Sequence, residues 1–372
     1  MANVWEQRKL GDFTWDAGKR NKEDLELEPY AITNEHGFIR QRDAHDDFGY
    51  MKDTDRKAYN IVQPNSFAYN PARINVGSIG YYKGVENVIV SSLYEVFQTD
   101  NYVNDRFLWH WLKSDEFPRW IEKLQEGSVR LYFYYDKLCE CQLYMPSLEE
   151  QEKIASFLDG LDHLITLHQR KCDETKKLKK YMLQKMFPQN GSKVPEIRLK
   201  GFTDEWEQRK LGNVAQEFKS GNSLKADEID ITGDYPVYGG NGLRGYTSTY
   251  NHDGEYALIG RQGALCGNMN YSAGKAYFTE HAVVVKADEN NDTSFLYYML
   301  DTMNLGQYSD QSAQPGLAVN KLVKLENSFP KKEEQQQIGT YFRSLDDLVT
   351  LHQHKCEELK KLKKFMLQNM FI

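Results

Sequence analysis

A stretch of 39 residues occurs twice in this chain, and this duplication constrains the fold more than any other feature. Glu149–Phe187 aligns with Glu333–Phe371 without a gap, and 24 of the 39 positions are identical. Shared helical composition does not produce such agreement, so the chain contains an internal repeat. In both copies apolar residues recur at steps of three and four, which predicts two long helices. We expect them to pack on each other as an antiparallel coiled coil.

A second, shorter repeat divides the rest of the chain. "WEQRKLG" occupies Trp5–Gly11 and again Trp206–Gly212. The repeated blocks enclose two variable segments, 12–147 and 213–330, that are only faintly alike. Their best-matching parts pair "ARINVGSIG" (Ala72–Gly80) with "GRQGALCGN" (Gly260–Asn268), and "FLWHWL" (Phe107–Leu112) with "FLYYML" (Phe295–Leu300). The two halves are therefore predicted to share one architecture, although their middle parts have diverged.

The variable segments predict an α+β fold class. Each mixes short β-rich runs such as "NVIVSSLYEVFQ" and "EHAVVVKA" with glycine- and asparagine-rich turns and short helices such as "DRFLWHWLKS" and "TSFLYYMLDTM". Two globular domains separated by two long helices follow from this reading. The predicted boundaries are a first domain over 1–147, a central helix over 148–187, a linker and second repeat start over 188–212, a second domain over 213–330 and a C-terminal helix over 331–372.

The order domain, helix, domain, helix suits a cyclic layout with a pseudo-twofold axis. In such a layout the two helices are antiparallel and the two chain ends lie near one another. The alternative is a plain tandem duplication without a closing contact. The stretch "KVPEIRLKGFTDE" precedes the second "WEQRKLG" block and has no copy before the first, a pattern that also suits the cyclic layout.

Composition excludes several classes of protein. Apolar residues make up 40% of the chain and aromatic residues 13%, as in folded proteins. No run of about 18 apolar residues predicts a membrane span, and the N-terminal sequence lacks the pattern of a secretory signal. The five cysteines show neither disulfide nor zinc-ligand spacing. We expect a cytoplasmic protein with reduced cysteines, no bound metal and no contact with a membrane.

Three motifs suggest chemistry, and each lacks the context that its chemistry needs. "GNGLRG" (Gly240–Gly245) has the spacing of a dinucleotide-binding loop, but the residues after it predict a strand and turn instead of a helix. "NPAR" (Asn70–Arg73) resembles the base-stacking motif of adenine-N6 methyltransferases, yet it ends in arginine instead of an aromatic residue. His163 and His168 are five residues apart, which is wrong for a helical metal pair. We expect no catalytic residues.

The quoted blocks together resemble a known family. The helices "EEQ…LDxLITLHQxK…KKLKKxMLQxMF", the blocks "GFTDEWEQRKLG" and the motifs "NPARINVGSIG", "YPVYGGNGLRGY", "LIGRQGALCGN" and "SAQPGLAVNKL" are similar to those of the specificity subunit of Type I restriction-modification enzymes. The resemblance covers essentially the whole chain. It implies two target recognition domains, each of which reads one half of a split, asymmetric site in double-stranded DNA.

The resemblance also implies the partners. The long helices would set the spacer between the half-sites and dock two methyltransferase (modification) subunits. The chain would carry no cofactor and no catalytic activity by itself, within an adenine-N6 DNA methyltransferase or Type I restriction endonuclease complex. S-adenosylmethionine and ATP with Mg²⁺ are expected on partner subunits. Whether restriction or translocase subunits join the complex stays open.

Helix length and charge refine this expectation. A helix of 40 residues spans about 60 Å, or some 17 bp of DNA. Because part of that length packs against the domains, we expect half-sites about 10 bp apart, centre to centre, on one DNA face. The segment 12–147 has 16 basic and 22 acidic residues, a net charge of −6, and 213–330 has 8 and 14, also −6. Because affinity for DNA grows with the phosphates neutralised, we expect the isolated chain to bind DNA weakly.

Candidate contact residues follow from the glycine-rich loops and from the helix periodicity. Arginine pairs well with guanine, and asparagine or glutamine with adenine. The predicted DNA-contacting residues are Asn70, Arg73, Asn75, Ser78, Arg130, Tyr134, Asn241, Arg244, Arg261, Gln262, Gln311 and Gln314. The predicted partner-docking residues are Leu161, Leu164, His168, Leu178, Met182, Leu345, Leu348, His352, Leu362 and Met366.

Several alternatives stay open at this stage. Arg73 and Arg261 occupy equivalent positions in segments expected to read different sequences, so either could hold a phosphate or a carboxylate instead of a base. The repeated lysines of the two helices could contact phosphates or form a solvated face. Two other functions compete with DNA recognition, namely a coiled-coil scaffold that binds only proteins and a catalytically active DNA methyltransferase or nuclease.

Overall fold

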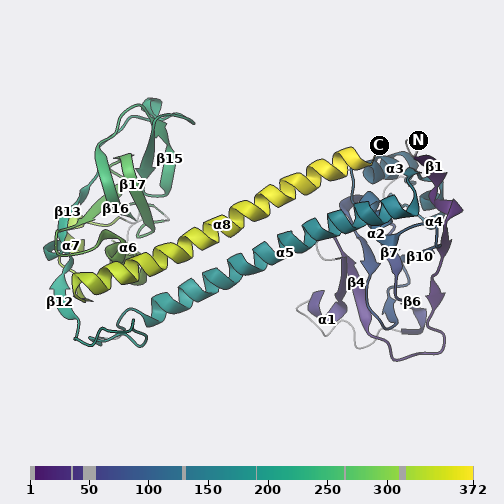
Figure 1. Cartoon of the computed structure of the whole chain (residues 1–372), viewed down its shortest axis with the longest axis horizontal. Coiled ribbons are helices and arrows are strands. Elements are labelled where there is room, and N and C mark those ends of the chain that lie inside the picture. Colours follow the sequence, from purple (N-terminus) through teal and green to yellow (C-terminus); the bar gives the residue numbers. More distant parts are fainter. Residues whose placement is uncertain are drawn as a thin grey trace. The chain divides into compact units, whose positions relative to one another are not determined.

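The computed structural model describes residues 5–34, 37–44, 56–127, 131–189, 191–263, 265–309 and 316–371. Contacts divide the chain into two units. Unit 1 comprises Met1–Leu167 with Lys355–Ile372, and unit 2 comprises His168–His354. The two predicted long helices are present as α5 (Leu148–Lys185) and α8 (Lys332–Met370), and each contributes one half to each unit (Figure 1).

Unit 1 is built from three sheets in its described part. Its strands are β1 (Glu6–Lys9) with β11 (Gln142–Met145); β2 (Thr14–Asp16), β10 (Glu95–Thr99), β7 (Ser66–Tyr69) and β8 (Ile79–Tyr82) in that order; and β3 (Lys19–Arg20), β6 (Asn60–Val62), β9 (Val88–Val90), β4 (Pro29–Thr33) and β5 (Gly37–Arg40) in that order. Its shorter helices are α1 (Gln41–Ala44), α2 (Asp105–Leu112), α3 (Glu116–Leu124) and α4 (Tyr135–Glu140), with 3-10 turns η1 (Leu10–Asp12), η3 (Arg56–Ala58) and η4 (Ile74–Val76).

Unit 2 has two sheets in its described part. Its strands are β12 (Glu207–Lys210) with β19 (Glu326–Phe329), and β13 (Ala215–Ser220), β18 (Ala282–Ala287), β16 (His252–Gly260), β17 (Met269–Phe278), β14 (Tyr235–Gly239) and β15 (Gly242–Thr247) in that order. Its shorter helices are α6 (Thr293–Thr302) and α7 (Val319–Leu322), with 3-10 turns η5 (Leu211–Asn213), η6 (Ala226–Glu228) and η7 (Leu305–Tyr308).

The two units repeat one strand order, which confirms the shared α+β architecture. The order β2-β10-β7-β8 in unit 1 corresponds to β13-β18-β16-β17 in unit 2, strand for strand along the chain. Both "WEQRKLG" blocks form a short strand that pairs antiparallel with the strand before the long helix. The five-stranded sheet of unit 1 was not predicted, because its strands are only two to five residues long and carry little periodicity.

The short helices α2 and α6 are fixed by equivalent capping contacts. The Asn104 side chain accepts hydrogen bonds from two backbone amides at the start of α2, and Asp292 accepts one at the start of α6. A glutamine in the first turn of each long helix then accepts a hydrogen bond from the backbone amide of that capping residue. Gln151 Oε1 accepts from the Asn104 amide at 2.9 Å, and Gln335 Oε1 accepts from the Asp292 amide at 3.0 Å. Each domain is therefore anchored to its long helix in the same way.

Apolar side chains from sheet, short helix and long helix form the main core of each unit. Phe67, Phe97 and Phe107 are fully buried with Leu158 of α5 in unit 1. In unit 2 the corresponding core contains Phe295 and Phe342. Because the long helices supply core residues to both units, they are part of the domains and not free-standing spacers.

The halves of α5 and α8 pack antiparallel within each unit, as the sequence predicted. In unit 2, Cys172 faces the Val349 carbonyl oxygen and Lys179 pairs with Asp346. In unit 1 the equivalent contacts join Cys356 to the Ile165 carbonyl oxygen and Lys363 to Asp162. Residue numbers rise along one helix as they fall along the other.

Both ends of the described chain lie in unit 1. Trp5 and Phe371 pack on the same ring, Phe107, with ring centroids 6.3 Å and 5.4 Å away. The predicted proximity of the two ends is therefore observed. Among the described helices, none has the combination of length and apolar composition that a bilayer crossing requires.

Candidate nucleic-acid interface

The loop between β7 and β8 presents polar side chains from unit 1. The Asn70 side chain accepts a hydrogen bond from the Ala72 amide at 3.0 Å, and the Arg73 amide donates to the Asn70 carbonyl oxygen at 3.0 Å. These bonds close a tight turn of the Asx type. Ile74 anchors the loop in the core, whereas the side chains of Arg73 and Asn75 are exposed. The turn therefore holds an arginine at the surface on a constrained backbone.

Arg73 borders a cleft of about 740 Å³. Tyr132 and Tyr134 line the same cleft, with their rings stacked at a centroid distance of 5.6 Å and an interplanar angle of 3°. Asn70 and Arg20 also contribute to the lining. Three of the predicted DNA-contacting residues, Asn70, Arg73 and Tyr134, therefore meet at one site. Tyr132 was missed because one residue in a strand-like run cannot be assigned to a surface without the fold.

The cleft holds charges of both signs. Burial, reinforced by Asp16 and Asp136, raises the pKa of the Glu95 carboxyl group. Among the described residues, Arg73 forms no ion pair with a carboxylate. Its guanidinium group is therefore available for an external acceptor such as a base edge or a phosphate.

The β14–β15 hairpin presents the first polar cluster of unit 2. The "GNGLRG" motif forms the turn and part of the second strand of this antiparallel hairpin, which confirms the predicted strand and turn after it. Asn241 lies in the turn and Arg244 in β15, and both side chains are exposed. A Cβ atom on Gly239 would lie 2.6 Å from Cδ of Arg244. The glycine thus leaves room for the arginine stem across the hairpin.

The β16–β17 loop adds Arg261 and Gln262 beside this hairpin. Arg261 is half-buried, and its Nη1 donates to the Ser220 hydroxyl oxygen at 3.1 Å. Gln262 is exposed, and its Oε1 accepts from Nδ1 of His281 at 3.1 Å. A Cβ atom on Gly240 would lie 2.9 Å from the His281 carbonyl oxygen, so the hairpin turn touches this loop cluster. Sequence reasoning missed His281, which directly precedes strand β18.

Arg73 and Arg261 occupy equivalent loops but differ in environment. Arg73 is exposed, whereas Arg261 binds Ser220 and the Glu280 carbonyl oxygen inside its own unit. By these two contacts Arg261 supports its own loop. Arg73 keeps an unobstructed guanidinium group.

One predicted DNA-contacting residue is buried, and three lie outside the described residues. Ser78 is buried, with 4% of its surface exposed, and its hydroxyl donates to the Ile32 carbonyl oxygen at 2.9 Å. It therefore holds β8 to the neighbouring strand β4 instead of facing DNA, which corrects the prediction. Arg130, Gln311 and Gln314 lie outside the described residues.

The ten predicted docking residues separate into four groups, one of which is the half-buried pair His168 and His352, whose rings contact each other. Leu161 and Leu345 are each 6% exposed and belong to the cores, so the prediction that they dock a partner is wrong. Met182 and Met366 are partly buried against the same cores. Apolar side chains that are 40–45% exposed form the fourth group, Leu164, Leu178, Leu348 and Leu362.

The fourth group is enlarged by aromatic residues that the prediction omitted. Tyr181 is 49% exposed and its repeat equivalent Phe365 is 58% exposed. Leu178 and Tyr181 are one turn apart on α5, and Leu362 and Phe365 are one turn apart on α8. We name two pairs the helix patches: Leu178 with Tyr181 in unit 2, and Leu362 with Phe365 in unit 1. Large exposed apolar side chains repeated at equivalent positions are typical of interaction surfaces.

The lysine runs have a mixed role. Lys179 and Lys363 are about four-fifths buried and pair with Asp346 at 2.6 Å and with Asp162 at 2.5 Å. The remaining lysines of both runs are exposed, namely Lys176, Lys177, Lys180, Lys360, Lys361 and Lys364. Two of the eight lysines therefore hold the helices together, and six face solvent.

A cluster of ionisable groups in unit 1 has the composition of a metal site. Ligand atoms of His110, Asp159 and Asp162 lie within 4.8 Å of one another. However, Arg106 already pairs with Asp159, and Lys363 pairs with Asp162. Burial, together with these two cations, lowers the pKa of His110 to about 4. We assign an ion-pair network to this cluster, because its carboxylates are already neutralised by protein cations.

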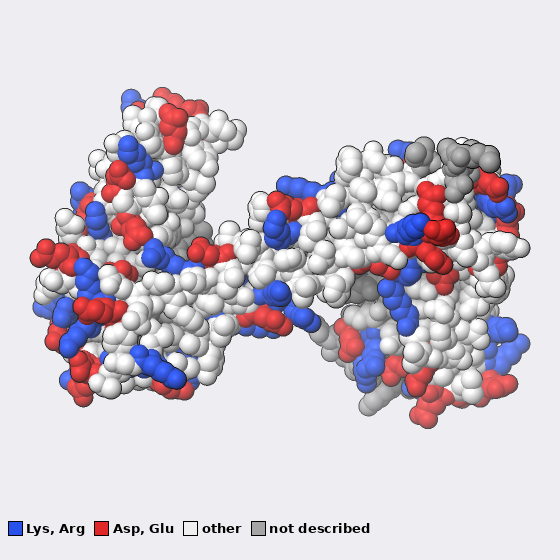
Figure 2. All heavy atoms as spheres, in the orientation of Figure 1, with Lys and Arg blue, Asp and Glu red and all other residues white. Residues whose placement is uncertain are grey.

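Neither unit has a continuous basic surface on the visible face. Figure 2 shows lysine and arginine side chains interspersed with aspartate and glutamate over both units. This agrees with the equal net charge of −6 in each variable segment. Local contacts, and not a general electrostatic field, must therefore carry any affinity for nucleic acid.

Comparison with known proteins identifies the family. The family model described as the Type I restriction modification DNA specificity domain matches residues 3–177 and 203–361. The specificity subunit of the Type I restriction enzyme EcoprrI from Escherichia coli is 42% identical over 149 residues, which cover 39% of this chain and 37% of that protein. The MjaVIII specificity subunit from Methanocaldococcus jannaschii is 24% identical over 97% of this chain and 90% of its own length.

A solved structure has the same fold. The crystal structure of the S subunit of a Type-I restriction-modification system from M. genitalium aligns with a TM-score of 0.70 and 18% identity, covering 100% of this chain and 97% of that one. The family model matches most of the chain in two blocks, one for each copy of the repeat. This chain belongs to the family of Type I restriction modification DNA specificity domains.

Proposed function

We propose that unit 1 and unit 2 each read one half of a split, asymmetric site in double-stranded DNA for a Type I restriction-modification complex. The observation that carries this proposal is a pair of loop clusters with different chemistry, built around the equivalent β7–β8 and β16–β17 loops of the same strand order. Unit 1 offers Arg73 beside the Tyr132–Tyr134 stack, and unit 2 offers Asn241, Arg244 and Gln262. One scaffold with two unlike clusters suits an asymmetric target.

Each cluster has groups suited to reading base edges. The exposed Arg73 and Arg244 can pair bidentately with guanine, and Asn241 and Gln262 can pair with adenine. The tyrosine stack offers an aromatic face and hydroxyl groups to the same site. Ser78 is not part of this proposal, since its hydroxyl is engaged within the unit.

The helix patches support the docking of two methyltransferase subunits. The patch Leu178 and Tyr181 and its equivalent Leu362 and Phe365 present one apolar surface twice. Two copies of one surface are suited to two copies of one partner. In this proposal the partners supply S-adenosylmethionine, ATP and Mg²⁺, together with the positive charge that the two units lack, and the complex acts in the cytoplasm.

Both long helices are shared by the two units, so we propose that they also set the unread spacer. Core residues of unit 1 and of unit 2 lie on the same α5 and the same α8. Changing the length of either helix would then change the gap between half-sites. In this proposal the exposed lysines of the helices contact either DNA or a partner subunit.

Methylome sequencing tests the proposal directly. This chain is expressed with a Type I methyltransferase subunit in cells without other adenine methylation. We expect modified adenines in one bipartite motif with a fixed gap. Replacing residues 213–330 by the corresponding segment of a relative should change one half of the motif and leave the other half and the gap unchanged.

Other outcomes would favour the competing functions. A soluble complex that leaves no modified motif would contradict DNA reading and favour a protein-binding scaffold. Methylation by this chain in the absence of any partner would contradict the non-catalytic role. A variant with Glu152→Gln, exposed near the start of α5, is the matched control and should give the same motif as the parent chain.

A further inference from the structure

In unit 2, the segment between α5 and β12 covers the start of α8. Arg198 pairs with Glu334 through two hydrogen bonds, Nε to Oε1 at 2.8 Å and Nη2 to Oε2 at 2.7 Å. Glu334 is 2% exposed, so this segment neutralises a buried carboxylate. Lys331 pairs with Asp204 of the same segment at 2.8 Å.

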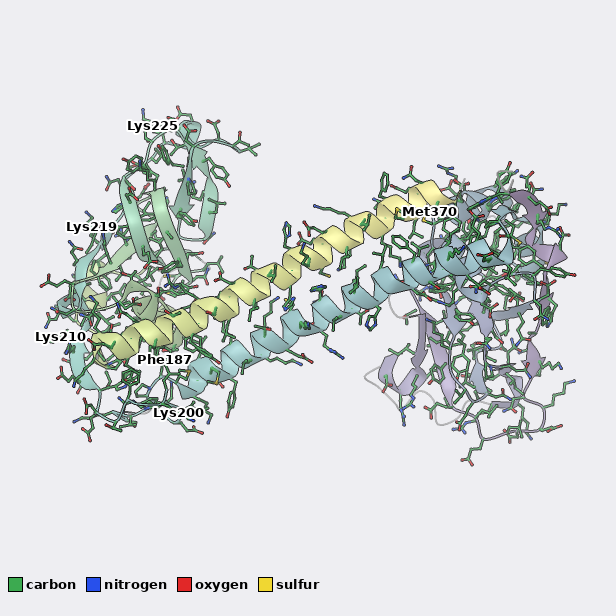
Figure 3. All side chains as sticks on the ribbon, viewed as in Figure 1. Phe187, Lys200, Lys210, Lys219, Lys225 and Met370 are labelled. Carbon is green, nitrogen blue, oxygen red and sulfur yellow. The ribbon has the colours of Figure 1, made fainter. Side chains whose placement is uncertain are left out.

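The segment also shields apolar groups of unit 2. Ile197 and Leu199 pack against the core, and Trp206 at its end is 1% exposed. The ring of Phe187, the aromatic residue that ends the repeat, packs on that of Trp206 with centroids 6.3 Å apart, and Figure 3 labels Phe187 and Lys200 of this segment. The covering peptide thus combines one arginine with aliphatic side chains on both sides of it.

The equivalent surface of unit 1 lacks this cover among the described residues. Glu150 occupies the place of Glu334 in the repeat, but no described arginine pairs with it. Its Oε1 accepts only a long hydrogen bond, 3.3 Å, from Nε1 of Trp5. Trp5 itself, the counterpart of Trp206, is partly exposed. The carboxylate and the indole ring of unit 1 are both less protected than those of unit 2.

Exposed apolar residues lie beside polar ones, among them Arg8, at this surface of unit 1. Tyr102 is 76% exposed and Leu148 is 43% exposed, and both line a groove of about 360 Å³ with Met145. At the corresponding positions unit 2 has the polar residues Asn290 and Lys332. At these two positions unit 1 is therefore more apolar than unit 2, and its described residues include no covering peptide. Trp5 and Glu150 are the sequence neighbours of two further lining residues, Glu6 and Gln151, and we name Trp5, Tyr102, Leu148 and Glu150 together the unit 1 groove.

We propose that the unit 1 groove binds an extended peptide of a partner protein in which an arginine is flanked by aliphatic or aromatic side chains, as in Arg198–Phe202. The arginine pairs with Glu150, and the apolar side chains cover Tyr102 and Leu148. Charge complementarity selects the arginine, since an Arg–carboxylate pair is bidentate and specific in geometry. The arrangement in unit 2 supplies the precedent for both contacts. This proposal does not depend on DNA recognition.

The test uses the full chain and a fluorescent peptide with the sequence of Val194–Glu205. Fluorescence anisotropy should give saturable binding to one site. The Glu150→Gln variant should bind at least tenfold more weakly, and so should a peptide in which Arg198 is replaced by glutamate. Leu148→Lys, which introduces the residue of unit 2, should also weaken binding. Glu149→Gln is the matched control, because that side chain is exposed and pairs with Lys153.

Three outcomes would overturn the proposal. The first is the absence of saturable binding to a chain that circular dichroism finds folded. The second is binding that Glu334→Gln abolishes and Glu150→Gln leaves unchanged, because the peptide would then exchange with the segment of unit 2. The third is a dimer of the chain, seen by light scattering and lost in Glu150→Gln, because the occupant would then be a second copy.

Discussion

The Nδ1 atoms of His168 and His352 lie 3.0 Å apart between α5 and α8. The two histidines are equivalent residues of the repeat, so this contact joins one position to its own copy. One nitrogen must donate and the other accept, which requires at least one neutral imidazole. Burial, and then the neighbouring His168 and Lys171, lower the pKa of His352. The helix contact is therefore formed best when His352 is neutral.

Acidification should weaken this contact. A histidine with a lowered pKa binds its proton more readily in the unfolded chain, so its contribution to stability is complete above about pH 6.5 and decreases as the pH falls below that value. We expect the loss of unfolding free energy between pH 7.5 and pH 5.5 to be smaller in His352→Gln, by on the order of 0.5 kcal/mol after allowance for solvent screening. Urea denaturation at the two pH values measures the difference.

The matched control for this pH effect is His163→Gln, since His163 is exposed on the same helix pair. The buried His110 contributes in the same direction, but it is present in the parent chain and in both variants, so its effect cancels. An unchanged pH dependence in His352→Gln would contradict a role for the histidine pair.

Removing Arg198 should destabilise unit 2 strongly. Its partner Glu334 is 2% exposed, and an unpaired carboxylate at that depth costs about 3 kcal/mol or more. We expect Arg198→Met to lower the unfolding free energy by that amount, and Glu334→Gln in the same chain to restore part of it. Arg209→Met removes an ion pair with an exposed partner, Glu207, and should cost about 0–1 kcal/mol. Equal effects of the two arginine substitutions would contradict the distinction between them.

Substitutions in the helix patches should remove the partner subunits one at a time. A glutamate at Leu178 or at Leu362 places a charge on an exposed apolar position without disturbing either core. We expect each single substitution to reduce the number of bound methyltransferase subunits from two to one, and the double substitution to leave none. Native mass spectrometry of the assembled complex gives the stoichiometry. Glu152→Gln, exposed near the start of α5, should keep two; loss of both partners in one single variant would argue against two equivalent sites.

Base contacts by the two exposed arginines should be separable. Arg73→Ala should lower the affinity of the assembled complex for its site by about 1–3 kcal/mol and relax selectivity in one half-site, and Arg244→Ala should do so in the other. Binding titrations at one fixed salt concentration with half-site variants measure both effects. Arg119 is exposed and pairs with Glu116 within its own helix, so Arg119→Ala serves as the control. A uniform loss across all DNA sequences would instead indicate phosphate contacts.

The sequence alone determined the elements whose pattern is long or local. The duplication and the three- and four-residue periodicity predicted α5 and α8, because a helix of 38 or 39 residues repeats its pattern many times. The "FLWHWL" and "FLYYML" runs predicted α2 and α6. Antiparallel packing and the closeness of the chain ends also followed from the order of the repeated blocks.

Only the tertiary structure decided which face of each element is covered. Periodicity gave Leu161 and Leu164 as similar apolar positions, yet the domain buries the first and leaves the second exposed. Likewise, Ser78 and Arg73 lie in one polar loop, but a neighbouring strand accepts the hydroxyl of Ser78. Tyr132 and His281 gained their positions from elements distant in sequence. Exposure depends on contacts between distant segments, which a local pattern does not encode.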